Sequence, residues 1–275
     1  MIILFWIPIA WVLERIQLKI GGQWYGSPFN GYGAIDSTND RTALAPMRYR
    51  VLVPWLVALA ERIFPRVKAH RLTALYEPLK IALTAAALIA VEAALGRERA
   101  LLVAALLPMT ILYDYWDWAG ELGGLALALT GNVWLGILGG VWIALSRPET
   151  APLVALAYGW STGNVIGTVA VAAVSALIID IIRRVQGNAP LYCARWMWRQ
   201  NWLDVRDIAR NRPVYLGEIS MSILISLLTV LGICTGRAGP TWPIPLALLA
   251  AGWTMARAAE TRVFCSCLLW ISFLI

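Results

Sequence analysis

The sequence predicts an all-α fold: a polytopic transmembrane helix bundle of about eight or nine helices, with an interfacial helix after the first outer loop. Of the 275 residues, 60% are hydrophobic and only 14% are charged, whereas roughly a quarter of the residues in a soluble domain are charged. The mean hydropathy is +0.67. Several segments approach the roughly 20 apolar residues that a membrane helix needs. Their Leu, Ala and Val runs lack the alternation of a membrane β-strand.

We expect residues 1–275 to form a single integral membrane domain. Residues 1–20 are predicted to be the first helix, running outward from the cytoplasm. A signal peptide is the alternative, and it is less favoured because the segment has no basic n-region and no small-residue cleavage site. Residues 21–50 are rich in Gly, Asn, Ser and Thr. A polar loop of this length between apolar segments is uncommon unless it is functional.

Residues 48–64 could either span the membrane or lie on it. They are apolar, but they are short for a span, contain Pro54, and carry Glu61 and Arg62 in the last turn. A charge in the middle of a bilayer costs about 2.5–3.5 kcal/mol, so an interfacial helix along the outer face is preferred. Residues 21–64 are therefore predicted to be an outer loop followed by an interfacial helix.

The remaining helices are placed by the lengths of the apolar segments. Residues 72–95 are predicted to cross inward to a short basic turn, and residues 100–113 to return outward. This topology puts the acidic, aromatic stretch 114–121 on the same face as residues 21–50. If residues 48–64 spanned the bilayer, these two stretches would lie on opposite faces. Further helices are predicted at 122–131, 133–146, 151–163 (short or re-entrant), 164–182, 214–236, 244–256 and 263–275.

The formal net charge of +7 is carried mostly by arginine, and residues 183–213 form the most basic stretch. Tryptophans are interleaved with the arginines there, a pattern that also occurs in proteins that bind single-stranded nucleic acid. In so apolar a chain, a basic amphipathic segment on the cytoplasmic surface of the membrane is the preferred prediction. Membrane lipids, and no nucleic acid, are the expected partners of this segment.

Several classes of function are disfavoured by residue type. His70 is the only histidine, which argues against a His-based triad, paired-His haem ligation and a His-rich zinc site. The four cysteines form no CxxC pair, and no Walker A or GxGxxG motif is present. Few charges lie within the apolar segments beyond Glu92 and Asp180. Glycines spaced by four residues either allow close helix contacts or reflect the abundance of glycine in membrane helices; they are Gly136 and Gly140, and Gly159, Gly163 and Gly167.

Two sets of charged residues are candidates for chemistry. The acidic set is Asp36, Asp40, Asp114, Asp117 and Glu121, and the arginine set is Arg48, Arg50 and Arg147, with Glu149 beside the last. A carboxylate can serve as general base for an attacking hydroxyl. Arginine binds phosphate through two parallel hydrogen bonds and stays charged. Together at one membrane face, the two sets would suit a reaction on a lipid-linked phosphate, although most loop charges are simply solvated.

The order of these features resembles the GT-C superfamily of membrane glycosyltransferases, which use polyprenyl-phosphate-linked sugars. The resemblance is one of pattern and covers about residues 1–160. It consists of a first helix, an outer loop with Asp36 and Asp40, an interfacial helix, the segment LLVAALLPMTILYDYWD with Asp114, and the polar break SRPETAPLVALAY with Arg147 and Glu149. The sequence Glu260-Thr261-Arg262 is similar to a late charged motif of some bacterial members. The chain departs from the pattern by having Asp-x-x-x-Asp in the first loop instead of a tight acidic pair, and by being short for the superfamily.

This resemblance implies an inverting transfer of a sugar from a polyprenyl-phosphate donor to an acceptor hydroxyl on the non-cytoplasmic face. Asp36 or Asp40 corresponds to the carboxylate that acts as base, and Asp114 to a second acid that orients the acceptor or a cation. The residues assigned to substrate binding are Arg48, Arg50, Asp117, Glu121, Arg147 and Glu149, with Arg50 and Arg147 as candidates for the donor phosphate. A divalent cation is the only cofactor considered, and it has no assigned ligand. The implied location is the bacterial or archaeal inner (plasma) membrane, with multiple passes.

Two other classes of function remain open from the sequence. A non-catalytic transmembrane subunit of a larger complex, with protein partners, would account for the tryptophan-rich interfaces and the short helices, because short helices tolerate membrane mismatch better inside an oligomer. A transporter would account for the interrupted helices near residues 151–167.

Overall fold

The chain folds into helices throughout the part that the structure describes, and none of those residues forms a strand. A computed structural model describes residues 2–21, 31–43, 47–70, 72–110, 116–188, 197–210, 213–256 and 261–274. The predicted all-α class is confirmed. The described residues contain thirteen α-helices rather than about eight or nine, because several short helices accompany the long ones.

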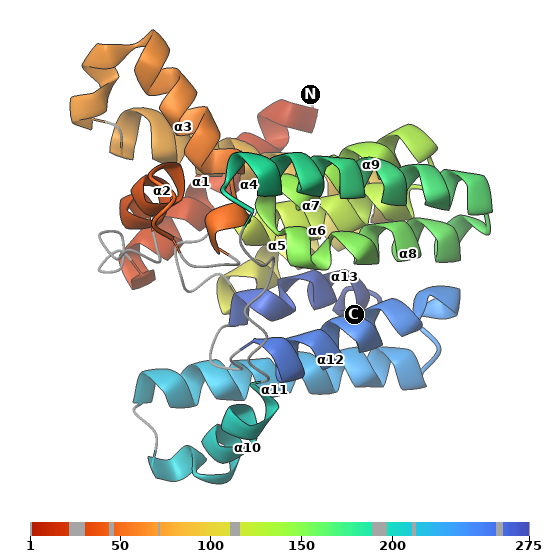
Figure 1. Cartoon of the computed structure of the whole chain (residues 1–275). Coiled ribbons are helices and arrows are strands. Elements are labelled where there is room, and N and C mark those ends of the chain that lie inside the picture. Colours follow the sequence, from red (N-terminus) through yellow and green to blue (C-terminus); the bar gives the residue numbers. More distant parts are fainter. Residues whose placement is uncertain are drawn as a thin grey trace.

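The first part of the chain contains two long helices with two short helices between them (Figure 1). Helix α1 packs against α4, and α4 is followed directly by α5 after a glycine with φ of 87° at Gly96. Side chains in the last turns of α1 pair with side chains in the first turn of α4, so the two helices are antiparallel. The bounds are α1 Ile2–Gly21, α2 Gly31–Asn39, α3 Leu52–Ile63, α4 Glu77–Leu95 and α5 Arg97–Leu106.

The middle of the chain is a series of antiparallel helices, and the last part forms a second layer beside it (Figure 1). The middle helices are α6 Asp117–Leu129, α7 Val133–Ser146, α8 Ala151–Thr162 and α9 Val165–Val185. The last helices are α10 Trp198–Arg206, α11 Pro213–Cys234, α12 Pro243–Met255 and α13 Leu268–Ile271. The middle and last layers meet through the 3-10 segment Thr261–Cys267, which contacts α6, α11 and α12.

Turn chemistry fixes the two tight connections within the middle layer. Gly131 (φ 75°) precedes Asn132, and Gly163 (φ 66°) precedes Asn164. Glycine adopts this left-handed conformation without the steric cost of a Cβ atom. The asparagine side chains then cap the next helices: Asn132 accepts a hydrogen bond from the backbone N–H of Trp134, and Asn164 accepts one from that of Gly167.

Most of the spaced glycines lie at close helix contacts. A Cβ atom at Gly140 would stand 2.3 Å from Ser175 Oγ, and one at Gly159 would stand 2.5 Å from Thr168 Oγ1. The same holds for Gly136 and Gly167, where an added Cβ would press on the ring of Tyr158. The structure therefore favours the close-contact interpretation for these four positions, while Gly163 serves the turn.

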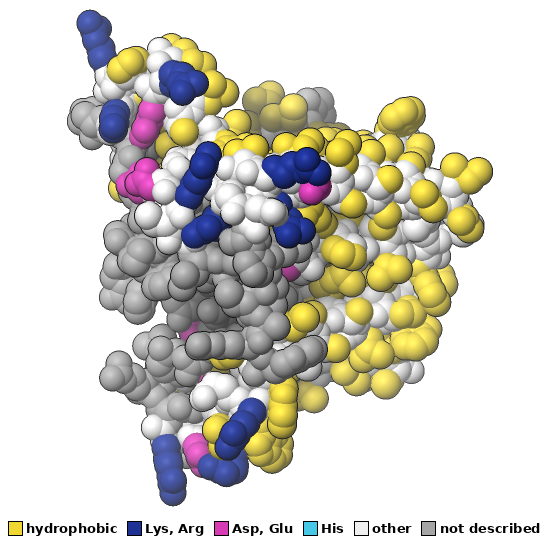
Figure 2. Space-filling model, viewed as in Figure 1, with side chains coloured by type: hydrophobic (Ala, Val, Ile, Leu, Met, Phe, Trp, Pro, Cys, Tyr) yellow, Lys and Arg dark blue, Asp and Glu magenta, His cyan; other side chains and the backbone are white. Residues whose placement is uncertain are grey.

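Most of the described charged residues gather at one end of the bundle. Helices α4 and α6 begin there and α7 ends there, at Glu77, Asp117 and Arg147, and this is called the charged end below. On the face drawn in Figure 2, Lys, Arg, Asp and Glu side chains lie toward this end, whereas hydrophobic side chains predominate toward the other end. Three described stretches are long and apolar enough to cross a membrane: Leu72–Leu95, Val165–Val185 and Leu216–Cys234.

The residues just before α3 and the residues to which the chain returns after α3 both lie at the charged end. Arg50, just before it, pairs with Asp117 at the start of α6. After α3, the chain returns to α4 through Tyr76, which joins Val53, Val57 and Trp116 in one buried cluster. The two flanks of α3 therefore lie on the same side of the bundle, as the interfacial prediction requires, and α3 is not among the described stretches long and apolar enough to cross a membrane.

Two predicted placements are wrong. The basic segment was expected on the surface opposite residues 21–50, but Ile182, at the end of α9, packs against Tyr49 and Val51. The segment that follows α9 therefore begins at the charged end. Helices α8 and α9 form an antiparallel pair, so α9 returns to the end of the bundle at which α8 begins.

The predicted last span, residues 263–275, is also wrong: the chain there forms the 3-10 segment Thr261–Cys267 and the four-residue α13. Its side chains are apolar because they are buried in protein, as the near-zero exposure of Cys265, Cys267 and Trp270 shows. Apolar composition alone does not distinguish a protein interior from a lipid environment.

Candidate functional site: a buried ion-pair cluster at the charged end

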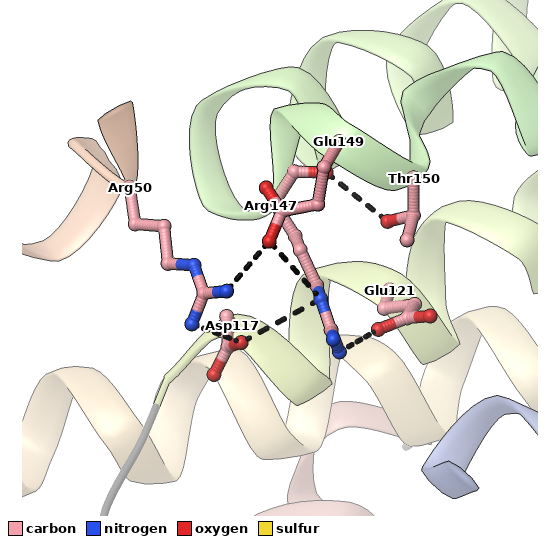
Figure 3. A network of polar contacts seen from close by, with 6 residues as sticks. All are labelled: Arg50, Asp117, Glu121, Arg147, Glu149 and Thr150. Atoms are coloured by element: carbon pink, nitrogen blue, oxygen red, sulfur yellow. Dashed lines mark hydrogen bonds and ion pairs between the residues drawn. The ribbon is translucent and has the colours of Figure 1, made fainter. Parts of the chain in front are cut away.

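Five of the predicted site residues meet at the charged end, and they come from three separate segments. Arg50 follows the 3-10 turn Met47–Tyr49, Asp117 and Glu121 lie in the first turns of α6, and Arg147 and Glu149 lie between α7 and α8 (Figure 3). These five residues are called the ion-pair cluster.

Local sequence rules explain how α6 and the α7–α8 connection present these side chains. Residues four apart lie on one face of a helix, so Asp117 and Glu121 point the same way. Pro148 disfavours helical geometry at the residue before it, and Arg147 is accordingly extended, with φ −151° and ψ 72°. Thr150 Oγ1 donates a hydrogen bond to the Arg147 carbonyl over 3.1 Å, which closes the short turn.

The two arginines bridge the three carboxylates. Arg50 Nη1 lies 2.9 Å from Asp117 Oδ2, and Arg50 Nη2 lies 2.6 Å from Glu149 Oε1. Arg147 Nη1 donates to Glu121 Oε2, and Arg147 Nε lies 3.5 Å from Glu149 Oε1 and 3.9 Å from Asp117 Oδ2. Glu149 thus pairs with both arginines. Through these pairs, the residues before α3, the start of α6 and the connection between α7 and α8 are linked to one another.

The ion-pair cluster is almost entirely withdrawn from solvent. Asp117 is 0% exposed, Glu121 1%, Arg50 5% and Arg147 7%. Glu149 is the most accessible member, with 16% of its side chain exposed. Two guanidinium groups face three carboxylates, so the formal charge of these five side chains is −1 when all are ionised. Because each arginine already has carboxylate partners, binding a donor phosphate through Arg50 or Arg147 requires one ion pair to open.

The other predicted site residues have different surroundings. Asp36 lies on α2 and is partly buried, whereas Asp40 is exposed just after α2. Arg48 Nε donates to the carbonyl of Ala43 over 2.9 Å, so it braces the turn after α2. Asp114 lies outside the described residues.

A hydrophobic cluster holds α2 close to the ion-pair cluster. Ile35, next to Asp36 in the chain, is fully buried with Val53, Val57, Tyr76 and Trp116. The rings of Tyr76 and Trp116 meet edge to face, with centroids 6.4 Å apart. Trp116 immediately precedes Asp117. The structure therefore places Asp36 and the acidic start of α6 at the same end of the bundle.

Sequence analysis missed a second polar set, formed by Glu14 and Gln17 on α1 and Lys80 on α4. Lys80 Nζ lies 3.0 Å from Glu14 Oε1 and 2.9 Å from Gln17 Oε1, and all three side chains are at most 3% exposed. The sequence did contain a signal for this pairing: one apolar segment carries a negative charge and another carries a positive charge. A charge within an apolar segment needs a partner of opposite charge.

A narrow crevice lies beside this polar set, between α4 and α6. It is lined by Lys80, Leu83, Thr84, Trp116, Trp118 and Ala119, and it has no room for a water molecule. A sugar would therefore enter only if side chains of α4 and α6 moved. Within the described ranges, no group of three or more His, Cys, Asp or Glu side chains is placed to hold a metal ion.

Comparisons of the chain with protein-family models, with curated proteins and with solved structures found no match.

Proposed function

We propose that this chain is a multi-pass integral membrane protein that transfers a sugar from a polyprenyl-phosphate donor to an acceptor hydroxyl. The inner membrane of a bacterium or archaeon, with the charged end on the non-cytoplasmic side, is the proposed location. Three helices with the length and composition of membrane spans support the membrane assignment. The observation that carries the enzyme assignment is the convergence of carboxylates and arginines from distant segments at one end of the bundle.

In the proposed reaction, a carboxylate removes the proton from the acceptor hydroxyl as the oxygen attacks the anomeric carbon. The bond between that carbon and the phosphate oxygen breaks, and polyprenyl phosphate leaves with the bonding electrons. Attack from the side opposite the leaving group inverts the configuration. Asp36 is the preferred base, because it is partly buried and stands beside the hydrophobic cluster that contains Trp116.

The ion-pair cluster has a positioning role in this proposal. It fixes residues 49–51 against α6 and thereby sets where α2 and α3 lie. Glu149, its most accessible carboxylate, is the member that could release an arginine to a phosphate, since it bonds both Arg50 and Arg147.

An assay with a defined polyprenyl-phosphate sugar tests the proposal. Asp36→Asn removes the base while it keeps the shape of the side chain, and we expect transfer to fall about 100-fold or more, as is typical for loss of general base catalysis. Asp180→Asn is the matched control, because Asp180 is a surface carboxylate paired with Arg184. Full activity in Asp36→Asn, Asp40→Asn and Asp114→Asn variants would overturn the proposal.

The closed, mutually paired state of the ion-pair cluster favours one alternative, a non-catalytic subunit of a membrane complex. A cluster that only braces helices needs no access for substrate. Purification in mild detergent separates the two ideas: a stable monomer that shows transfer supports the enzyme, and a fixed assembly with other proteins and no transfer supports the subunit.

A further inference from the structure

The short helix α10 has two faces of opposite character. Asn201 and Asp204, three residues apart, are 1% and 6% exposed. Trp198 and Trp202, four residues apart on the other side, are 57% and 64% exposed. Residues three or four apart share a face of a helix, so the tryptophans form one outward surface.

The buried face fastens α10 to the end of α12. Asn201 Nδ2 donates to the carbonyls of Trp253 and Ala256, over 2.7 and 2.8 Å. The backbone N–H of Met197 donates to the carbonyl of Thr254 over 2.7 Å. The last carbonyls of a helix lack partners within that helix, so Asn201 supplies donors that α12 would otherwise take from water. Helix α10 is therefore held at the charged end in a fixed orientation.

Basic residues accompany the tryptophans. Arg199 is exposed on α10, and Arg210 is exposed in the 3-10 turn Ile208–Arg210 that follows it. Arg206 Nη2 lies 2.9 Å from Asp207 Oδ2, and this hydrogen bond lowers the pKa of Asp207, so the aspartate stays ionised and offsets Arg206. Over residues 183–213 the sequence contains seven arginines and two aspartates, a surplus of five positive charges.

We propose that α10 docks on the anionic phospholipid headgroups of the membrane, with Trp198 and Trp202 in the headgroup layer and Arg199 and Arg210 on lipid phosphates. Tryptophan prefers the membrane interface because its ring is apolar and its N–H is polar. Basic side chains near an anionic surface add electrostatic attraction. The occupant is a lipid surface rather than an acidic protein, because α10 packs on the end of α12 and the turn after it contacts α11, which contains a stretch long and apolar enough to cross a membrane (Figure 1).

A lipid titration of the full chain tests this docking. The protein is purified in an uncharged detergent, and its unfolding temperature is followed as phosphatidylglycerol or phosphatidylcholine is added in mixed micelles. We expect phosphatidylglycerol to raise the unfolding temperature at lower concentration than phosphatidylcholine. The double variant Arg199→Gln/Arg210→Gln should need roughly 25-fold more phosphatidylglycerol for the same rise.

The matched control is Arg41→Gln/Lys68→Gln, which removes two exposed cations from the same end of the molecule, outside both α3 and α10. It should keep the wild-type midpoint. Equal loss in both double variants, or equal effects of the two lipids, would overturn the proposal.

Tryptophan depth gives a second measurement that does not depend on the arginine variants. The fluorescence difference between wild type and Trp198→Phe/Trp202→Phe isolates the two rings. Phosphatidylglycerol brominated high in its acyl chains should quench this difference more strongly than lipid brominated near the chain ends. An unquenched difference would mean that the two rings face water or another protein, contrary to the proposal.

Discussion

Arg147 is the residue on which most contacts of the ion-pair cluster converge. It reaches Glu121, Asp117 and Glu149 with its side chain, and its carbonyl accepts a hydrogen bond from Thr150. A charge buried to 7% exposure is tolerated only when it is paired. The carboxylates of Glu121, Asp117 and Glu149 are also largely withdrawn from solvent, and they depend on Arg147 for charge pairing.

Removing that one cation should be costly. In Arg147→Met, Glu121 loses its guanidinium partner in a buried place, and we expect the free energy of unfolding to fall by about 3–5 kcal/mol. Denaturation in mixed micelles measures it. The control Arg184→Gln breaks an exposed ion pair to Asp180 and should cost less than about 1 kcal/mol. Similar small losses in both variants would contradict a structural role for the cluster.

The sequence indicated which residues belong to the ion-pair cluster, but it did not indicate which arginine pairs with which carboxylate. Arg50, Asp117 and Arg147 were found because charges interrupt apolar runs. Which arginine meets which carboxylate depends on how α6, α7 and α8 pack, and spacing alone does not contain that information. Glu14 and Lys80 were missed because each lies in a segment whose average composition is apolar, and the average hides a single charge.

At the scale of the helices, α6 and α7 approach each other backbone to backbone. A Cβ atom at Gly139 would stand 2.5 Å from the carbonyl oxygen of Gly124, and one at Gly124 would stand 2.8 Å from that of Gly139. The neighbour is backbone in both cases, so it cannot move aside as a flexible side chain could. This contact brings Glu121 and Arg147, at the charged end of the same two helices, within reach of each other.

Alanine at Gly139 should therefore separate the two helices. We expect Gly139→Ala to lower the free energy of unfolding by about 1–3 kcal/mol through overpacking. Gly217→Ala is the matched control, since Gly217 lies in helix α11 with open space around its Cα atom. There the helix preference of alanine should add up to about 1 kcal/mol. A neutral Gly139→Ala variant would show that α6 and α7 have room to adjust.

The attachment of α10 is a property of two helices and can be tested separately. In Asn201→Ala, the carbonyls of Trp253 and Ala256 lose their side-chain donor. We expect the backbone amides of α10 to exchange with deuterium at least tenfold faster, consistent with a loss of about 1–3 kcal/mol. Amides of α7, on the far side of the bundle, should keep their wild-type rates. Faster exchange throughout the chain would indicate general destabilisation instead.

Long helices were the most predictable elements and short ones the least. The predicted 133–146 matches α7, and 72–95 and 164–182 nearly match helical stretches of the structure, because apolar length is a strong local signal. Helix α6 begins at Asp117, whereas the prediction began it at residue 122, after the charged residues. Asp117 and Glu121 are buried because they pair with Arg50 and Arg147, which lie far away in the sequence. The predicted last span, residues 263–275, is wrong for a related reason: an apolar segment buried in protein has the same composition as one buried in lipid.

At the scale of the whole molecule, the two ends differ in charge. The opposite end carries Arg97, Arg99 and Arg237 in the described residues, whereas the charged end carries more cations, among them Arg41, Arg62, Arg66 and Lys68. The positive-inside rule alone would place such an end in the cytoplasm. The proposed reaction requires the other orientation, so the orientation of the chain is a decisive measurement.

A membrane-impermeant maleimide applied to intact cells makes that measurement. Cys234 is exposed at the end of α11 remote from the charged end, and Asp40 is exposed at the charged end. If the proposed reaction is right, Asp40→Cys in a Cys193→Ser/Cys234→Ser background is labelled from outside, and Cys234 in a Cys193→Ser background is not. Labelling of Cys234 alone would place the charged end in the cytoplasm and contradict transfer on the non-cytoplasmic face.

The pairing of Lys80 with Glu14 and Gln17 has a consequence for biosynthesis. Helices α1 and α4 are separated by more than 50 residues of chain, so α1 leaves the ribosome well before its partner exists. A lone Glu14 or Lys80 in hydrocarbon costs about 2.5–3.5 kcal/mol, and that cost disappears only when the two meet. We therefore expect α1 to remain bound at the insertion machinery until α4 has left the ribosome. The two helices should then enter the bilayer together.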